Sequence, residues 1–190
     1  MYDVGTAVKR PFSNVKSLIM GMIFLIIPIL NLAAIGYLLK CAKTASQGDY
    51  SMPEWTDWGG LIVSGLLSIV IIFVYMIPGM ILAVIGGVLS VMGDIIGIIG
   101  LIVSFLSFLF FVLGVYFGVI ALIKYAIEGS VGSAFSVGAI IKKGLKLDYV
   151  VTLIVGGIIS DLMIMFTLGL LSFPAMVHFY TALGETYSKL

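Results

Sequence analysis

The stretch 59–93 reads "GGLIVSGLLSIVIIFVYMIPGMILAVIGGVLSVMG" and contains no charged side chain. Asp94 follows it, and the chain is then uncharged again over residues 95–123. One α-helical crossing of a bilayer needs about 20 consecutive apolar residues. The region from Gly59 to Ile123 is therefore long enough to cross a membrane more than once.

The number of crossings in this region depends on where the chain turns. Pro78-Gly79 is a natural first break, and the glycines around Asp94 supply a second one. These two breaks predict three crossings. The alternative is two long, tilted helices, 59–92 and 95–123, each of which would overshoot the hydrocarbon core by several turns.

The composition places the whole chain among integral membrane proteins. Hydrophobic residues make up 62% of the 190 positions and charged residues 10%, whereas a soluble domain has about 45–50% and about 25%. A net charge of +1 provides no basic field for nucleic acid. One cysteine and one histidine leave no metal cluster or hydrolytic dyad. We therefore expect no cofactor, no metal site and no enzymatic activity.

Two further apolar regions flank the central one. Residues 18–39 are uncharged over a length greater than a signal-peptide core, which favours one retained crossing. The region 149–187 predicts two short crossings, 149–166 and 169–187, with one long crossing as the alternative. The sequence thus predicts an all-α, polytopic transmembrane bundle of about six helices, or four to five in the alternative. Residues 1–190 would form a single integral membrane domain.

The basic residues predict the orientation. Three of them lie in the segment 1–17 and four lysines lie in the segment 124–148. Cytoplasmic loops of membrane proteins are enriched in Lys and Arg. Both segments are therefore expected in the cytoplasm, with four crossings between them. The protein would then be a multi-pass plasma-membrane protein with both termini in the cytoplasm. The loop 40–58 would then face the outside.

The loop 40–58 contains both tryptophans of the chain, within "MPEWTDW" at residues 52–58. Trp and Tyr favour the headgroup region because one end of the ring is apolar and the other forms hydrogen bonds. The predicted interface anchors are Tyr50, Pro53, Trp55 and Trp58. The alternative function for this loop is extracellular recognition of a partner.

The segment 124–148 separates apolar from basic side chains, although imperfectly. The pattern predicts a juxtamembrane amphipathic helix along the inner leaflet, with Lys142, Lys143 and Lys146 at the lipid headgroups. Each lysine near anionic lipid would contribute about 1 kcal/mol. The alternative is a plain basic cytoplasmic loop.

Small residues four positions apart mark candidate helix contacts. Gly114 and Gly118 form one such pair, and Ser64 and Ser68 form another. This spacing lets helices approach closely within one chain or between two copies. The pattern therefore fits internal packing and homo-oligomerisation equally well.

Three stretches resemble an uncharacterised family of small polytopic membrane proteins, labelled as a domain of unknown function and found mainly in archaea and some bacteria. They are "KRPFSNVKSLIMG" at residues 9–21, "PEWTDWGGLIVSGL" at 53–66 and "AIEGSVGSAFSVGAII" at 126–141. The resemblance implies a membrane protein. It implies no activity, so it assigns no catalytic residue.

Three functions remain as candidates. The leading hypothesis is a non-catalytic scaffold or partner-binding protein in the lipid bilayer, whose partner is another membrane protein or a second copy. The second is a small solute or ion carrier or channel that uses Asp161 and His178, because an ionisable side chain within a membrane is by default a hypothesis for a functional site. The remote third is an intramembrane aspartic protease using Asp94 and Asp161. The stretch Val91–Asp94 lacks the first glycine of the Gly-x-Gly-Asp motif that such proteases carry.

Overall fold

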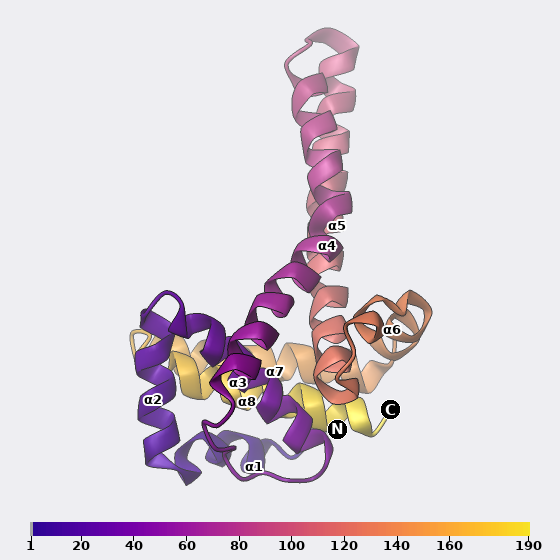
Figure 1. Ribbon diagram of the computed structural model, residues 1–190. Helices are drawn as coiled ribbons and strands as arrows, with labels where there is room; N and C mark the ends of the chain where they lie inside the picture. The colour runs from indigo at the N-terminus through magenta and orange to yellow at the C-terminus, as the bar shows by residue number, and fades with distance from the viewer. Residues whose placement is uncertain (1) are drawn as a thin grey trace.

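The computed structural model describes residues 2–190, and all the regular structure in this range is helical (Figure 1). This confirms the predicted all-α class. The α-helices of the described residues are α1 (Val4–Lys9), α2 (Val15–Ile26), α3 (Leu30–Ser46), α4 (Trp58–Ser90), α5 (Asp94–Glu128), α6 (Val137–Gly144), α7 (Leu147–Phe166) and α8 (Ser172–Ser188), and two 3₁₀ segments, η1 (Arg10–Ser13) and η2 (Val131–Phe135), connect some of them.

The central apolar region forms one long hairpin that projects from the rest of the molecule (Figure 1). Its two arms are α4, with 33 residues, and α5, with 35 residues. The turn between them contains Gly93, whose φ of 73° requires the freedom of glycine. We call the remaining helices, together with the start of α4 and the end of α5, the base.

The predicted three crossings in 59–123 are therefore wrong, and the alternative of two long helices is correct. Pro78 lies inside α4 without ending it. A proline removes one backbone N–H, and a helix tolerates that loss where the flanking turns are strongly apolar and packed on a neighbour. Here Gly79 packs against the backbone and ring of Phe111 in α5, so α4 continues beside its partner.

The first apolar region is also divided differently from the prediction. Residues 18–39 do not form one helix, because α2 ends at Ile26 and α3 begins at Leu30. The turn contains Pro28, and the side-chain amide of Asn31 donates a 2.8 Å hydrogen bond to the carbonyl of Leu25 at the end of α2. The polar residue of this stretch thus closes a turn.

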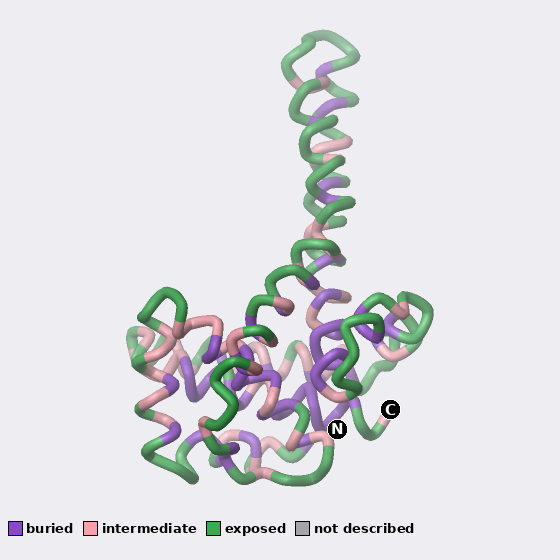
Figure 2. The backbone as a smooth tube through the Cα atoms, in the orientation of Figure 1, coloured by how far each residue is buried: buried purple, intermediate pink, exposed green. Residues whose placement is uncertain are grey.

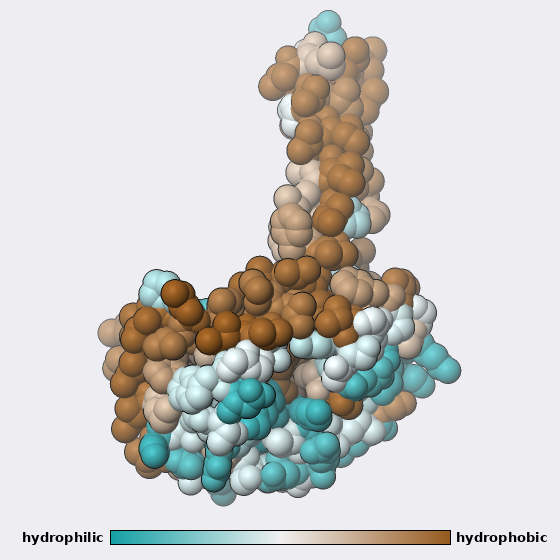
Figure 3. All heavy atoms as spheres, viewed as in Figure 1, coloured by the Kyte–Doolittle hydropathy of each residue, from teal (hydrophilic) through white to brown (hydrophobic). Residues whose placement is uncertain are grey.

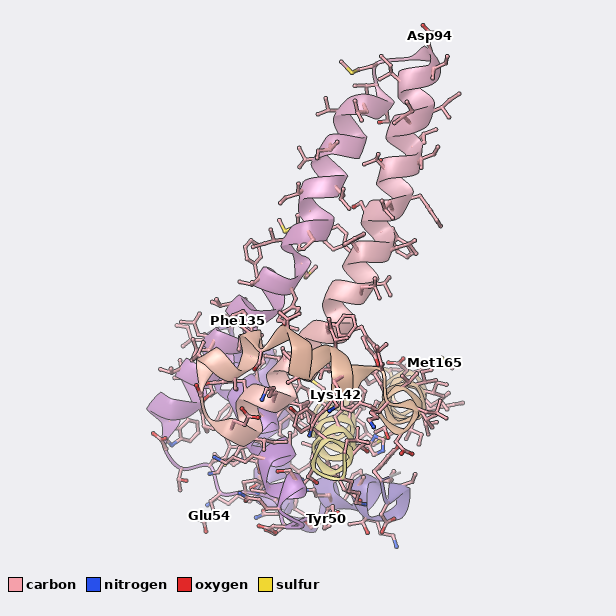
Figure 4. The ribbon with its side chains drawn as sticks, turned by 90° about the vertical axis from the view of Figure 1, so that its right-hand side faces the viewer. Tyr50, Glu54, Asp94, Phe135, Lys142 and Met165 are labelled. Carbon is pink, nitrogen blue, oxygen red and sulfur yellow. The ribbon has the colours of Figure 1, made fainter. Side chains whose placement is uncertain are left out.

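The C-terminal region divides where the sequence predicts. α7 and α8 are separated by a turn at residues 167–171, which includes the predicted boundary between the segments 149–166 and 169–187. Both helices lie crosswise to the hairpin: they run across the base in Figure 1 and are seen end-on in Figure 4. Among the described residues, three helices are long and apolar enough to cross a membrane, namely α4, α5 and α7. The six-crossing arrangement is not reproduced.

The segments 40–58 and 124–148, predicted to face opposite sides of a membrane, lie at the same end of the hairpin, where residues of both line one pocket. The side that each segment faces stays a prediction. Two helices, α4 and α5, lie between these segments instead of the predicted three. Because the two helices are antiparallel, the chain returns to the end of the hairpin from which it started. Figure 4 shows Tyr50 and Glu54 at the end of the molecule opposite Asp94. Both segments also contain more helix than expected, because α3 continues to Ser46 and α5 to Glu128.

The hydrophobic core sits in the base, while most of the hairpin surface is exposed (Figure 2). The largest cluster joins the end of α5 to α3, α6, α7 and α8 around Ile120, Ile123, Tyr149 and Leu183. A second cluster joins α2, α3, α8 and the 47–57 loop. Figure 3 shows apolar residues over most of the visible face of the hairpin, a hydrophilic tip, and hydrophilic residues on the underside of the base.

Candidate functional site

The Trp-containing loop, residues 47–57, packs onto the base through its aromatic residue Trp55. Its ring stacks on Tyr37 of α3, and its Nε1 donates a 3.3 Å hydrogen bond to the carbonyl of Ser17 in α2. The hydroxyl of Tyr37 donates to the carbonyl of Pro53 at 2.7 Å. Of the predicted interface anchors, Pro53 is buried and Trp55 half-buried, so both serve internal packing, whereas Trp58 is exposed.

Arg10 also binds this loop, through hydrogen bonds to the carbonyl of Ser51, and the sequence did not predict this role. The side chain is buried, and its guanidinium donates to the carbonyls of Cys41 (2.7 Å) and Ser51 (2.9 Å and 3.2 Å). It also donates to the hydroxyls of Thr181 (2.9 Å) and Thr44. All five N–H donors of the arginine are thus used. In the sequence Arg10 looks like one more cytoplasmic charge, because its acceptors are distant and neutral.

A buried carboxylate, Glu185, lies near the N-terminus of the chain. Its carboxylate accepts a hydrogen bond from the backbone N–H of Asp3 at 3.2 Å and forms an ion pair with Lys189 at 2.6 Å. Burial, and secondarily the Glu185 carboxylate, raise the pKa of Tyr50 to about 12. Tyr50 therefore faces a carboxylate of α8, and the two ends of the chain meet beneath the loop.

A pocket of about 310 Å³ opens between α3, the start of α4 and the end of α5. It contains the polar side chains Lys40, Lys43, Thr56, Asp57 and Ser64. The ammonium of Lys40 donates to the carbonyl of Glu54 at 2.9 Å, and Asp57 accepts from the N–H of Gly60 at 3.1 Å. Much of this polar set is therefore occupied in joining the loop to α3 and α4.

The structure does not bring Asp161 and His178 together. His178 is fully buried on α8, where its Nδ1 lies 3.1 Å from the hydroxyl of Ser160 and its Nε2 lies 3.4 Å from the hydroxyl of Tyr2. The neighbouring Asp161 is exposed on α7. The Ser160 hydroxyl donates to the carbonyl of Ala175 at 3.0 Å, so it accepts from the Nδ1–H of a neutral imidazole. Burial lowers the pKa of His178, which favours that neutral form.

Asp94 and Asp161 are also far apart in the fold. Asp94 begins α5 at the free end of the hairpin (Figure 4), whereas Asp161 belongs to α7, which lies in the base (Figure 1). A two-aspartate protease needs both carboxyls on one scissile bond, and this arrangement does not provide it. Within residues 2–190, no three His, Cys, Asp or Glu side chains are grouped so as to hold a metal ion.

The lysines of the basic segment have different surroundings. The ammonium of Lys143 lies 3.7 Å from the ring centroid of Tyr187 and donates to the Tyr187 carbonyl at 2.9 Å. Burial, and then the nearby Lys124 charge, lower the pKa of Lys143. Lys142 and Lys146 are exposed at the two ends of the α6–α7 corner. Only these two of the three predicted headgroup contacts therefore point to the surroundings.

The predicted small-residue motifs serve contacts inside the chain. A Cβ added to Gly114 would lie 2.5 Å from the carbonyl oxygen of Tyr75, and one on Gly118 would lie 2.8 Å from Ile72 Cδ1, so both glycines face α4. Ser68 donates to the carbonyl of Ser64 within α4. The Gly114–Gly118 pair thus lies in the interface between the two arms of the hairpin.

Over residues 2–190 these features define an all-helical fold with three helices apolar enough to span a membrane, and with its charged side chains, apart from Asp94, collected in the base. Residues 19–179 match the family described as "Protein of unknown function (DUF4013)". The chain therefore belongs to this family, which confirms the expected uncharacterised domain. The match carries no statement about membrane insertion or archaeal origin. Neither a curated protein nor a solved structure matches the chain.

Proposed function

We propose that the protein is a non-catalytic membrane scaffold, anchored by the α4–α5 hairpin and presenting the polar underside of its base to a partner. The observation that carries this proposal is the surface of the hairpin. Apolar side chains such as Val84 and Phe105, 68% and 66% exposed, project from both arms. In water such a surface would drive aggregation, whereas in lipid it is solvated.

The hairpin has dimensions suited to a bilayer. The part of α4 beyond its contact with η2, residues 75–90, spans roughly 24 Å at 1.5 Å per residue. The hydrocarbon core of a bilayer is about 30 Å thick. A helix satisfies its own backbone hydrogen bonds, as a lipid-exposed segment must. The hairpin can therefore cross almost the whole core, with the top of the base close to the headgroups.

Charge supports a cytoplasmic base. The chain has no Lys or Arg between Lys43 and Lys124, so all ten basic residues belong to the base and none to the hairpin beyond it. The positive-inside rule then favours a plasma-membrane protein with the base and both termini in the cytoplasm and the Asp94 turn outside. This keeps the predicted position of the termini and reverses that of the loop 40–58.

The scaffold role is favoured over a carrier by the arrangement of polar groups. His178 is enclosed by Ser160 and Tyr2, away from the exposed Asp161, so the two residues proposed for transport form no shared site. Several buried polar side chains of the base fasten one helix to another, as Arg10, Thr152 and Ser160 do. The partner would be another membrane protein or a second copy, recognised at the polar underside.

Thiol labelling in intact cells tests the anchor and its orientation. Cys41 is the one cysteine of the chain, and burial raises the pKa of its thiol to about 12. Cys41→Ser therefore removes the native thiol, so that only the introduced cysteines can react. A membrane-impermeant reagent should label V91C and should not label S51C or S136C until the cells are opened. Labelling of S51C or S136C in intact cells, without labelling of V91C, would overturn the orientation. Labelling of all three sites in intact cells would overturn the anchor.

Photo-cross-linking tests the scaffold role. A photoreactive residue at the exposed Glu54 of the underside should give one reproducible adduct of defined mass, while the same residue at Val91 should not. Solute-dependent thermal stabilisation of the purified protein, with no adduct from Glu54, would replace the scaffold by the carrier.

A further inference from the structure

Two turns of the base present large apolar side chains to the surroundings. The α2–α3 turn exposes Ile26 and Ile29, and the α7–α8 turn exposes Phe166, Leu168 and Leu170. These five side chains are between 70% and 96% exposed. A turn in water usually carries Gly, Asn, Asp or Ser, so this composition is unusual for a solvated turn.

The two turns are neighbours and form one surface, which we call the apolar corner. Leu25 of α2 and Phe173 of α8 pack in the same hydrophobic cluster, directly beneath the turns. Gly21 leaves no room for a side chain beside the Phe173 ring, so α2 and α8 approach closely. In Figure 3 the apolar surface continues from the hairpin across the upper rim of the base to this side.

The backbone N–H groups of the α7–α8 turn are satisfied internally. The N–H groups of residues 168–172 all bond within residues 164–172, at 2.8–3.3 Å, four to carbonyls and that of Leu171 to the Thr167 hydroxyl. Leu168 adopts a φ of 49°, which a leucine rarely does, and it is the most exposed of the five corner side chains. A segment that enters hydrocarbon must satisfy its own N–H groups in this way.

The direction of α7 excludes a third crossing parallel to the hairpin. α7 lies crosswise to α4 and α5 (Figures 1 and 4), so a bilayer crossed by the hairpin has α7 in its plane. One face of α7 exposes apolar side chains three or four positions apart, namely Ile154, Ile158, Leu162 and Met165, and Asp161 is exposed beside them. An exposed carboxylate is costly at the bilayer centre but not among headgroups.

We infer that the apolar corner inserts into the acyl region of the leaflet nearest the base, with α7 lying along the interface. The inference rests on the proposed hairpin anchor. The occupant of the corner is lipid, because the corner continues the apolar surface of the anchor and the N–H groups of its α7–α8 turn are bonded within the chain. It also accounts for the length of the hairpin, since a base pressed into the headgroups compensates for an arm shorter than the hydrocarbon core.

Depth-dependent quenching in liposomes tests the inference. An environment-sensitive fluorophore is placed in a Cys41→Ser background at L168C and I29C in the corner, at V84C in the hairpin and at E54C on the underside. The quenchers are nitroxides carried on lipids either near the ester carbonyls or near the ends of the acyl chains. We expect L168C and I29C to be quenched more by the shallow nitroxide, V84C more by the deep one, and E54C by neither.

The outcomes separate the inference from the proposed function. Quenching of V84C without quenching of L168C and I29C would overturn the shallow insertion and leave the anchor intact. Preferential deep quenching of L168C would also overturn it, because α7 would then cross the bilayer. An unquenched V84C would overturn the anchor itself and with it the inference. The two corner sites lie on different turns, so a folding defect in one variant leaves the other as the test.

Discussion

The rings of Tyr37 and Trp55 stack in parallel, with their centroids 4.0 Å apart and their planes inclined by 8°. The same tyrosine donates its hydroxyl to the carbonyl of Pro53, two residues before the tryptophan. One side chain of α3 therefore holds the loop by stacking and by a hydrogen bond. Trp55, a residue type typical of membrane interfaces, is therefore a packing residue of the base.

The first prediction compares the two tryptophans. Trp55→Ala should destabilise the protein by about 3 kcal/mol, because it removes an aromatic ring packed on Tyr37 and Phe24 and leaves a cavity. Trp58→Ala should cost about 1 kcal/mol or less, because that ring is 40% exposed. Thermal unfolding in detergent measures both. Equal losses for the two variants would contradict the packing role of Trp55.

The second prediction concerns Arg10. Arg10→Lys should destabilise the protein by at least about 3 kcal/mol, because an ammonium cannot reach the four acceptors that the guanidinium fork serves at once. Lys9→Ala is the matched control, since Lys9 is an exposed neighbour and its loss should leave the melting temperature unchanged. Unchanged stability of Arg10→Lys would show that the carbonyls of Cys41 and Ser51 do not depend on this side chain.

The helical class and the α7–α8 turn follow from the sequence, because apolar runs and their breaks are local properties. The continuation of α4 through Pro78 does not, since it depends on Phe111 from the other arm packing against Gly79. The predicted orientation counted three helices in residues 59–123, whereas the structure has two, α4 and α5. An even number of helices brings the segments 40–58 and 124–148 to the same end of the hairpin.

The candidate site was less accessible to sequence reasoning than the fold. Trp55 has the composition of an interface anchor, and only its contact with Tyr37 identifies it as a packing residue. Arg10 carries no local signal, because its acceptors come from α3, the loop and α8. His178 was found as a buried ionisable group, but the residue facing it is Ser160, one position from the expected Asp161.

The third prediction is a pH dependence that originates at His178. Burial lowers its pKa in the folded state below the usual value of 6.5, so between the two values the unfolded chain binds the proton and the folded protein does not. Stability should therefore be fully present above about pH 6.5 and decrease as the pH falls towards the folded-state pKa. Melting temperatures measured from pH 7.5 down to pH 5 test this.

The control for the third prediction removes the titrating group. His178→Gln retains a hydrogen-bonding side chain next to Ser160 and Tyr2 without a proton to bind in this range. It should melt lower than the wild type at pH 7.5 but lose less stability on acidification. A variant that keeps the full wild-type slope would assign the pH dependence to another group.

The fourth prediction separates a structural from a transport role for Asp161. The side chain is exposed on α7 and does not face His178. Asp161→Asn should therefore melt at the same temperature as the wild type at each pH from 5 to 8, with or without sodium. A sodium- or pH-dependent stabilisation of the wild type that disappears in Asp161→Asn would identify a cation site and favour the carrier.

The fifth prediction tests the glycine contact between the two arms of the hairpin. A Cβ at Gly114 would lie 2.5 Å from the backbone carbonyl oxygen of Tyr75, and backbone cannot move aside as a flexible side chain can. Gly114→Ala should therefore separate α4 from α5 locally and cost about 1–3 kcal/mol. Gly87 is the matched control: it lies inside α4, and a Cβ there would meet no atom within 4 Å. Gly87→Ala should be neutral or stabilise the helix by up to about 1 kcal/mol, so that the two variants shift the melting temperature in detergent in opposite directions or differ clearly in size. A Gly114→Ala protein as stable as Gly87→Ala would mean that the arms do not pack at the distance described, and that the hairpin is held by the turn at Gly93 and by the base alone.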